Sequence, residues 1–352
     1  MIRSTRLLPA LLLACVAACD APVERGDARE VDAFTPPTTG LDSALVEAAR
    51  ARLDSLVQAR SLLVARHGEL HAEYYFNGRD GDDFANLKSV SKSILSALVG
   101  IAIAEGHLSG VEQPVAPFFA AELPRSPDPR IHEVTIGDLL SMRAGLEPTS
   151  FGSYGEWVSS PDWVRYALAQ GFVDEPGGRM LYSTGNTHLL SAILTRATGM
   201  DTWSYARAKL GDPLGIEIPR WQRDPQGFYF GGNDMLMRPR DLLRIGELYR
   251  RGGEWDGRQV VPAEWVEQSL VVRTRSPWNG NGYGYGWWSQ RIGRRIVHFA
   301  WGYGGQYLFL VPDLDLTIVV TSDPAPRQAR GDYRAELFAS VRDVIRAAEL
   351  GR

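Results

Sequence analysis

The chain has 352 residues, of which 44% are hydrophobic and 23% are charged, and its formal net charge is −4. A chain of this length and composition can bury a large core, so it predicts one large domain or two interleaved ones. Acidic and basic residues are mixed along the chain, so it lacks the excess of basic residues that is typical of proteins that bind nucleic acids or anionic membrane surfaces.

The first 18 residues predict a signal peptide that is not part of the fold. Arg3 and Arg6 precede an apolar stretch, residues 7–18, that is too short to span a membrane. The sequence Val-Ala-Ala-Cys that ends at Cys19 resembles the lipobox of bacterial lipoproteins, in which this cysteine is acylated and becomes the first mature residue. The charged and proline-containing residues 19–41 then predict a tether.

Both cysteines of the chain, Cys15 and Cys19, lie in this segment, so the remaining chain has neither a disulfide nor a thiol nucleophile. A poorer lipobox match ends at Cys15. The alternative is a plain secretory signal in which both cysteines are incidental. Either interpretation predicts export to the bacterial cell envelope, and lipidation of Cys19 would anchor the protein to a membrane on its periplasmic side.

The folded domain is predicted to cover residues 42–350. Asp42 and Ser43 are capping residues for an amphipathic helix, whose apolar positions recur at helical spacing: Leu45, Ala49, Leu53 and Leu56. Two strands follow, at 61–65 and 70–76, and the sequence Arg-His-Gly-Glu between them favours a hairpin turn.

Ser89 and Lys92 stand three residues apart, just before an apolar run at 94–104 that predicts a buried helix. On a helix the two side chains share one face. Burial lowers the pKa of a lysine, and a neutral lysine can take the proton of a serine that attacks a carbonyl carbon. The chain has only two other lysines, Lys88 and Lys209. The alternative is a helix-capping serine followed by a lysine that reaches to solvent.

The stretch from about 110 to 270 predicts a helical subdomain inserted between sheet segments at 60–77 and 283–322. Within it, Tyr182 and Asn186 stand where a loop meets an apolar helix expected at 189–197. A tyrosine at such a junction can shuttle a proton. The alternative for Tyr182 is a half-buried ring with a bonded hydroxyl.

Near the C-terminus the pattern changes to strands, expected at 284–291, 295–300, 306–311 and 316–321, and an amphipathic helix is expected at 334–350. An N-terminal hairpin alone would be marginally stable, so we expect it to pair with these strands. The predicted fold class is α+β, with one antiparallel sheet flanked by the N- and C-terminal helices.

Glycines interrupt this strand run in the sequence Trp301-Gly302-Tyr303-Gly304-Gly305-Gln306. Glycine weakens a strand, and it is tolerated at a bulge or where another molecule approaches the backbone. A tight bend is one interpretation. The functional interpretation is a strand edge at which the backbone amide of Tyr303 joins that of Ser89 as an oxyanion hole.

Three segments, at 89–92, 182–186 and 301–306, together resemble the serine β-lactamase-related family. This family includes class C β-lactamases, D-alanyl-D-alanine peptidases, esterases and 6-aminohexanoate-dimer hydrolases. The resemblance implies that Ser89 is the acylated nucleophile, Lys92 its base and Tyr182 the proton shuttle, with no cofactor. It also implies that five residues line the substrate pocket: Asn186, Trp301, Gly302, Gly304 and Gln306.

The chain departs from the family pattern at two positions. Thr184 stands where many members carry the asparagine of Tyr-x-Asn, and Ala300-Trp301-Gly302 replaces Lys-Thr-Gly or His-Thr-Gly. The lost cation is the one expected to hold a substrate carboxylate, so its absence disfavours β-lactams and peptide C-termini. Tyr-Ser-Thr-Gly-Asn and Gly-Tyr-Gly-Gly-Gln look closer to the 6-aminohexanoate-dimer hydrolases and esterases. The cation could still come from Arg291, Arg294 or Arg295.

Other functions fit the sequence less well. The six histidines are scattered, which disfavours a metal site. Four aromatic residues, Tyr283, Tyr285, Trp287 and Trp288, could form a sugar-binding platform but fit a core and pocket wall better. The remaining alternatives are a β-lactamase or D-alanyl-D-alanine carboxypeptidase acting on cell-wall-like substrates, and a non-catalytic, membrane-tethered sensor that resembles a penicillin-binding protein.

Overall fold

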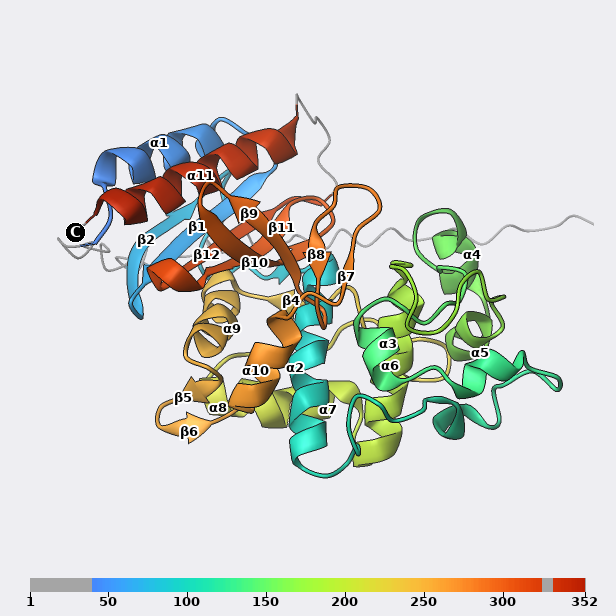
Figure 1. Ribbon diagram of the computed structural model, residues 1–352. Helices are drawn as coiled ribbons and strands as arrows, with labels where there is room; N and C mark the ends of the chain where they lie inside the picture. The colour runs from blue at the N-terminus through green and yellow to red at the C-terminus, as the bar shows by residue number, and fades with distance from the viewer. Residues whose placement is uncertain (1–39, 325–331, 352) are drawn as a thin grey trace, which may run out of the picture. The chain divides into compact units, whose positions relative to one another are not determined.

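The computed structural model describes residues 40–324 and 332–351 (Figure 1). The predicted signal peptide, both candidate lipidation sites at Cys15 and Cys19, and nearly all of the predicted tether lie outside the described residues. Within the described ranges, no helix is both long enough and apolar enough to cross a membrane.

The core element is an eight-stranded antiparallel sheet with the strand order β2-β1-β12-β11-β10-β9-β8-β7. The N-terminal hairpin joins the C-terminal strands through β1 and β12, as expected from the sequence. The strand bounds are β1 Ala59–Arg66, β2 Glu69–Tyr75, β7 Thr274–Arg275, β8 Gly282–Tyr283, β9 Trp288–Ile292, β10 Arg295–Gly302, β11 Gln306–Val311 and β12 Leu316–Ser322.

Both faces of this sheet are buried, because its side chains alternate between two cores. In β1, Leu62 and Val64 face one core, whereas Leu63 and Ala65 face the other. The first core is covered by helix α1 (Ser43–Asp54) and helix α11 (Tyr333–Leu350), which pack side by side (Figure 1). The second is covered by helix α9 (Pro239–Arg250), which packs on β1, β11 and β12.

The strand expected at 284–291 is correct only in its second half, because residues 284–287 form a turn between β8 and β9, and β9 begins at Trp288. The amide of Gly284 donates to the carbonyl of Trp287, and Gly286 has a φ of 81°, so the chain turns between the two strands. The turn is packed against other backbone: a Cβ on Gly284 would lie 2.2 Å from the carbonyl oxygen of Ser269. Alternating polarity alone does not reveal such a contact.

Most of the remaining helices surround helix α2 (Ser91–Ala104), which is buried for nearly its whole length, as its apolar sequence predicts. Helix α9 lies in the stretch expected to be the helical subdomain, yet it packs on the sheet. The other elements are α3 Ile136–Leu140, α4 Tyr154–Ser159, α5 Trp163–Leu168, α6 Thr184–Thr198, α7 Thr202–Ala206, α8 Asp212–Leu214, α10 Ala263–Leu270, and the short strand pairs β3 Ala85–Asn86 with β4 Leu236–Met237 and β5 Glu254–Trp255 with β6 Arg258–Gln259.

Candidate active site

Ser89 stands in a short 3-10 helix, Lys88–Val90, that runs directly into α2. Lys88 adopts the left-handed backbone conformation (φ 50°), which is unfavourable for a residue with a side chain. The turn is held by the amide of Lys88, which donates to Asn86 Oδ1 (3.0 Å), and by the hydroxyl of Ser91, which donates to the carbonyl of Lys88 (2.7 Å). Ser89 is thus presented, half-buried, on a fixed and strained turn.

Lys92 lies one helical turn beyond Ser89, and only 2% of its surface is exposed. Its Nζ is 2.9 Å from Ser89 Oγ, 2.7 Å from the carbonyl oxygen of Gly232 and 3.3 Å from Thr184 Oγ1. A neutral amine has two N–H groups and one lone pair. The N–H groups can be donated to Gly232 and Thr184, which leaves the lone pair facing the hydroxyl of Ser89.

Burial lowers the pKa of Lys92 from 10.5 to about 7, because the charged form loses its hydration inside the protein. The carboxylate of Asp234 opposes this effect, but it already forms an ion pair with Lys88 (2.6 Å). A substantial fraction of Lys92 is therefore neutral near pH 7, which is the state that a general base requires.

Tyr182 lies beside Lys92, whose Nζ is 5.2 Å from the centroid of the Tyr182 ring. Its ring stacks on Trp288 (5.7 Å between centroids) and meets Tyr283 edge-on (6.2 Å). Burial raises the pKa of Tyr182 to about 12, although a hydrogen bond with Ser89 works in the opposite direction. The phenol therefore keeps its proton at neutral pH and is suited to donate it.

Thr184 occupies the place where the family pattern has an asparagine, and its hydroxyl reaches Lys92. Helix α6 begins at this residue, five residues earlier than the apolar run at 189–197 indicates. Two side chains that precede α4 hold the start of α6 in place. The amide of Thr184 donates to Ser150 Oγ (2.8 Å), and the amide of Gly185 donates to Thr149 Oγ1 (2.9 Å). A threonine hydroxyl thus makes a polar contact with Lys92 from the position where many family members carry asparagine.

The glycine-rich segment approaches Ser89 from the end of β10. A Cβ on Gly302 would lie 2.2 Å from the carbonyl oxygen of Leu87, so only glycine allows this strand to pack against the turn that carries the serine. In the described part of the chain, the backbone amides of Ser89 and Tyr303 donate to no other group. Both amides are therefore available to a ligand.

Ser89, Tyr182 and Tyr303 line one cavity of about 440 Å³, together with Phe151, Trp278, Asn279, Trp288, Trp301 and Arg334. Three aromatic rings stand at its rim with large exposed fractions: 71% for Phe151, 61% for Trp278 and 74% for Tyr303. The wall is therefore mainly aromatic, which suits an apolar substrate group.

Sequence reasoning missed four of these residues: Phe151, Trp278, Asn279 and Arg334. Trp278 and Asn279 stand in the loop between β7 and β8, and Phe151 begins a short 3-10 helix, Phe151–Ser153, that precedes α4. A tryptophan within a run of turn residues was the available signal for Trp278. Nothing in the local pattern distinguishes Phe151 or Arg334 from an ordinary surface residue.

Several residues expected in the pocket lie elsewhere. Asn186 is buried in the first turn of α6, and the side chain of Gln306 joins β11 to β12 by bonding the backbone of Ser322. Gly302 is buried beneath the cavity wall, and Gly304 lies against Pro324 in an adjoining hollow. Of the predicted pocket residues, Trp301 is the one that lines the cavity with Ser89.

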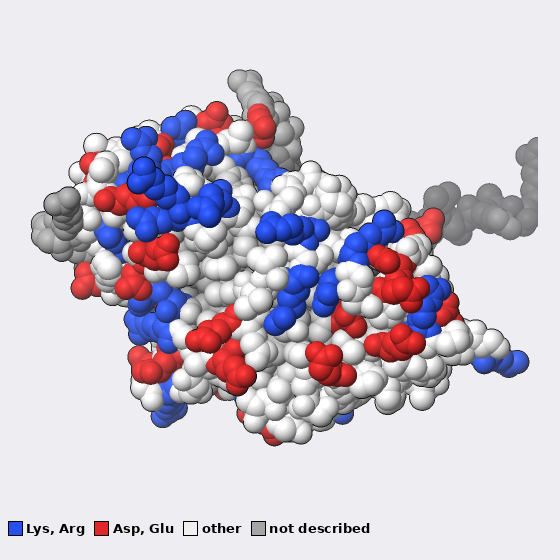
Figure 2. Space-filling view, in the orientation of Figure 1, with Lys and Arg blue, Asp and Glu red and all other residues white. Residues whose placement is uncertain are grey.

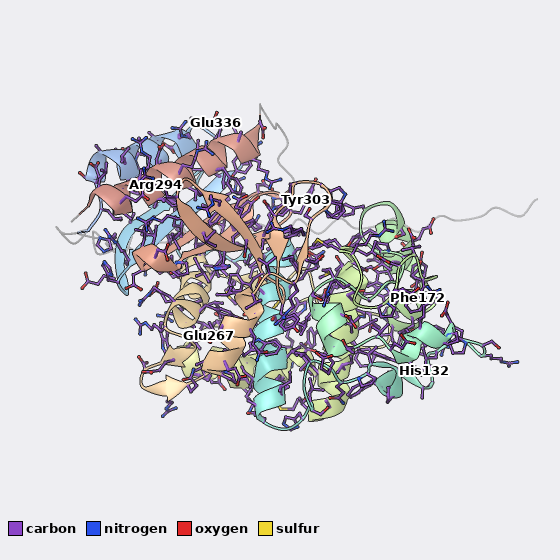
Figure 3. The ribbon with its side chains drawn as sticks, viewed as in Figure 1. His132, Phe172, Glu267, Arg294, Tyr303 and Glu336 are labelled. Atoms are coloured by element: carbon purple, nitrogen blue, oxygen red, sulfur yellow. The ribbon has the colours of Figure 1, made fainter. Side chains whose placement is uncertain are left out.

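Arg294 lies at the far end of β10 from Tyr303 (Figure 3), and Arg291 stands beside that end, because β9 pairs it with Ile296. Arg295 begins that strand, and its side chain pairs with Glu349 (3.0 Å) and Asp313 (3.8 Å). Eight strand residues span about 25 Å. Arg291, Arg294 and Arg295 therefore do not reach Ser89.

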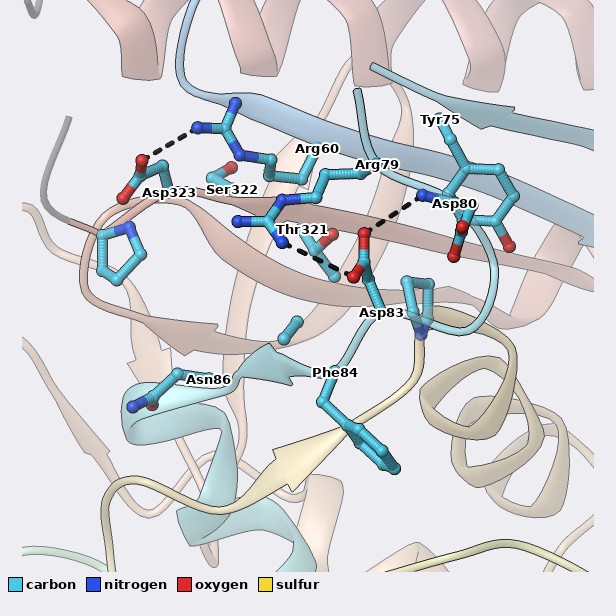
Figure 4. Close-up of a pocket in the computed structure, with 13 residues that line it drawn as sticks. Arg60, Tyr75, Arg79, Asp80, Asp83, Phe84, Asn86, Thr321, Ser322 and Asp323 are labelled. Carbon is cyan, nitrogen blue, oxygen red and sulfur yellow. Dashed lines mark hydrogen bonds and ion pairs between the residues drawn. The ribbon is translucent and has the colours of Figure 1, made fainter. Parts of the chain in front are cut away.

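The described residues form another polar hollow on the side of Arg60 and Arg79 (Figure 4). Both of its arginines are paired with carboxylates, Arg60 with Asp323 (2.8 Å) and Arg79 with Asp83 (3.5 Å). It contains no serine and lysine in contact. The aromatic residues proposed as a sugar platform are also buried, with Tyr283, Tyr285, Trp287 and Trp288 all less than 5% exposed.

Known proteins resemble this chain over most of its length. The profile of the beta-lactamase family matches residues 49–342. A 6-aminohexanoate-dimer hydrolase from Paenarthrobacter ureafaciens is 28% identical over 304 residues, which cover 77% of this chain and 75% of that protein.

Solved structures show the same fold. A candidate 6-aminohexanoate-dimer hydrolase from Bacillus anthracis superimposes with a TM-score of 0.73 at 20% identity, over 85% of this chain and 82% of the other. EstCE1, a hydrolase with promiscuous acyltransferase activity, superimposes with a TM-score of 0.67 at 18% identity, over 85% and 98% of the two chains.

Proposed function

Because the chain belongs to the beta-lactamase family, we propose that it is a serine hydrolase that cleaves an ester or amide through a covalent acyl-enzyme on Ser89. One observation carries the proposal: Lys92 Nζ, with a pKa of about 7, lies 2.9 Å from Ser89 Oγ beside an open aromatic cavity. A buried lysine this close to a serine hydroxyl has the position and basicity of a general base.

In the proposed mechanism, the lone pair of Lys92 takes the proton of Ser89 as Oγ attacks the substrate carbonyl. The amides of Ser89 and Tyr303, which have no partner in the described chain, stabilise the negative charge on the carbonyl oxygen. Tyr182 donates its proton to the leaving alcohol or amine, and the proton on Lys92 restores that of Tyr182. Water then attacks the acyl-enzyme by the reverse proton path, which releases the acid and regenerates Ser89.

Short esters and linear amides are the proposed substrate class. The position of the family's lysine or histidine is held by Ala300, which is fully buried and carries no charge. The aromatic cavity supports binding of an apolar acyl or leaving group. The 6-aminohexanoate-dimer hydrolase relative is consistent with an amide of this kind.

The test is a comparison of p-nitrophenyl acetate, p-nitrophenyl butyrate, linear amides, D-amino-acid peptides and nitrocefin, with Ser89→Ala as the blank. We expect turnover of a short ester and little turnover of nitrocefin. Equal rates for nitrocefin and the ester would favour the β-lactamase alternative instead. A folded wild-type protein that turns over none of them and does not react with a fluorophosphonate would favour the non-catalytic sensor.

We further propose that the protein is exported and that Cys19 carries a lipid that holds the catalytic domain at the bacterial envelope. The support is the sequence itself, with its basic start, its short apolar run and Val-Ala-Ala-Cys ending at Cys19.

A further inference from the structure

Arg334 is the one charged side chain that lines the cavity of Ser89 in the described structure. It stands in the first turn of α11, more than 240 residues after Ser89 in the chain, so nothing in the local sequence connects the two. The remaining wall is aromatic except for Ser89 and Asn279. A cation at this position changes which substrates the cavity can hold.

The guanidinium of Arg334 is held in place by aromatic rings. Its Cζ lies 4.5 Å from the centroid of Trp301 and 5.5 Å from that of Phe338. Trp301 and Tyr307 are themselves stacked, with an angle of 3° between their planes. A guanidinium has five N–H donors. These contacts therefore fix its orientation and leave donors available to a ligand.

No carboxylate of the described residues pairs with Arg334. By contrast, Arg295 pairs with Glu349, and the nearby Asp332 uses its carboxylate to cap the amide of Ala335. A cation in the first turn also opposes the helix dipole, whose N-terminal end is positive. Among the described residues, aromatic rings stabilise the guanidinium but no opposite charge neutralises it, so a bound anion would be its ion-pair partner.

The positive charge continues beyond the cavity. A neighbouring hollow of about 430 Å³ is lined by three arginines, Arg291, Arg334 and Arg342, and by one carboxylate, that of Asp332. Figure 2 shows that basic side chains gather over α11 and the adjoining strands. This arrangement favours the approach of negatively charged molecules toward the mouth of the cavity.

We propose that Arg334 binds a carboxylate of the substrate, so that the enzyme prefers esters or amides that carry an anionic group besides the scissile bond. The proposal rests on the proposed hydrolase function and names its substrate class. The aromatic wall holds the apolar part of such a substrate, and Arg334 holds the carboxylate by charge-assisted hydrogen bonds.

Two matched pairs of esters test the proposal. 4-Nitrophenyl hydrogen glutarate and its methyl ester differ by one charge on the acyl side, whereas 4-acetoxybenzoate and its methyl ester differ by one charge on the leaving group. We expect the wild-type protein to favour the anionic member of at least one pair in kcat/KM by about tenfold. Equal rates within both pairs would overturn the proposal.

Variants separate charge from packing. Arg334→Gln should abolish the anionic preference, and Arg334→Lys should keep part of it, because the lysine retains the cation. Arg294→Gln removes an arginine from the far end of β10 and should leave the preference unchanged. An anionic preference that survives Arg334→Gln would mean that another residue binds the carboxylate, and it would overturn the proposal. If no ester acylates Ser89 at all, the hydrolase function fails instead, which is a distinguishable result.

Discussion

At the scale of single residues, the chemistry depends on a lysine that is held inside the protein. Lys92 is nearly fully buried, and its two N–H groups can be used by Gly232 and Thr184. Burial lowers the pKa of Lys92, and the contacts with Gly232 and Thr184 direct its lone pair toward Ser89. A lysine at the surface, with a pKa near 10.5, would be almost entirely charged at neutral pH and could not act as a base.

The pH dependence of catalysis follows from this residue. Because the neutral amine is the active form and its pKa is about 7, log kcat/KM for a neutral ester should rise with pH and level off above about pH 7. Tyr182, with a pKa of about 12, should cause no loss of activity in the neutral range. Initial rates from pH 5 to 9 measure the profile, and a flat profile would contradict the role of Lys92.

Asp234 provides a control for the assignment of the pH profile to Lys92. Its carboxylate raises the pKa of Lys92, although burial has the larger effect. Removing that charge in Asp234→Asn also leaves Lys88 without its ion-pair partner. Both changes disfavour the charged form of Lys92, so the rise in the pH profile should move to lower pH. A shift to higher pH would mean that another group controls the profile.

At the scale of elements, the site forms where three segments meet: the turn before α2, the start of α6 and the end of β10. Their meeting depends on Gly302, because a Cβ there would lie 2.2 Å from the carbonyl oxygen of Leu87. Backbone cannot yield as a flexible side chain would. The end of β10 therefore packs directly against the turn that carries Ser89, and this packing requires glycine at position 302.

Gly302→Ala should separate these two surfaces. We expect kcat/KM for a short ester to fall by at least about tenfold and the free energy of unfolding to fall by about 1–3 kcal/mol, the usual range for overpacking. Gly155→Ala is the matched control, because a Cβ there has no neighbour within 4 Å. Ester kinetics and chemical denaturation of both variants give the comparison, and an unaffected Gly302→Ala protein would refute this contact.

The sequence predicts these elements unevenly. The place of Ser89 at the start of a buried helix and the pairing of the N-terminal hairpin with the C-terminal strands follow from residue spacing and apolar periodicity. The break between β8 and β9 does not, since it depends on Gly284 packing against the backbone of Ser269. The contact of Thr184 with Lys92 also escapes prediction, because it requires the position of α6 relative to α2.

At the scale of the whole molecule, the fold class could be predicted because strands and helices alternate in recognisable blocks. The cavity wall could not, since Phe151, Trp278 and Arg334 come from three loops or termini that meet only in the folded chain. Sequence reasoning looked for the missing cation at Arg291, Arg294 and Arg295. Those residues are near Tyr303 in the sequence but lie at the other end of an extended strand.

The proposed anchor makes a prediction for the complete protein. Expressed in a bacterial host with labelled palmitate, the wild-type chain should incorporate the label and fractionate with membranes. Cys19→Ser should lose both properties, whereas Cys15→Ser should keep them. Labelling that requires Cys15 would place the processing site at Cys15 instead of Cys19. An unlabelled wild-type protein in the soluble fraction would indicate a plain secretory signal.

The central claim is that Ser89 carries the acyl group during turnover. The most direct measurement is mass spectrometry of the protein quenched in acid during turnover of p-nitrophenyl acetate or butyrate, followed by peptide mapping. We predict an acyl adduct on the peptide that contains Ser89, and its absence from Ser89→Ala. An adduct on another residue, or ester turnover by Ser89→Ala at the wild-type rate, would contradict the account.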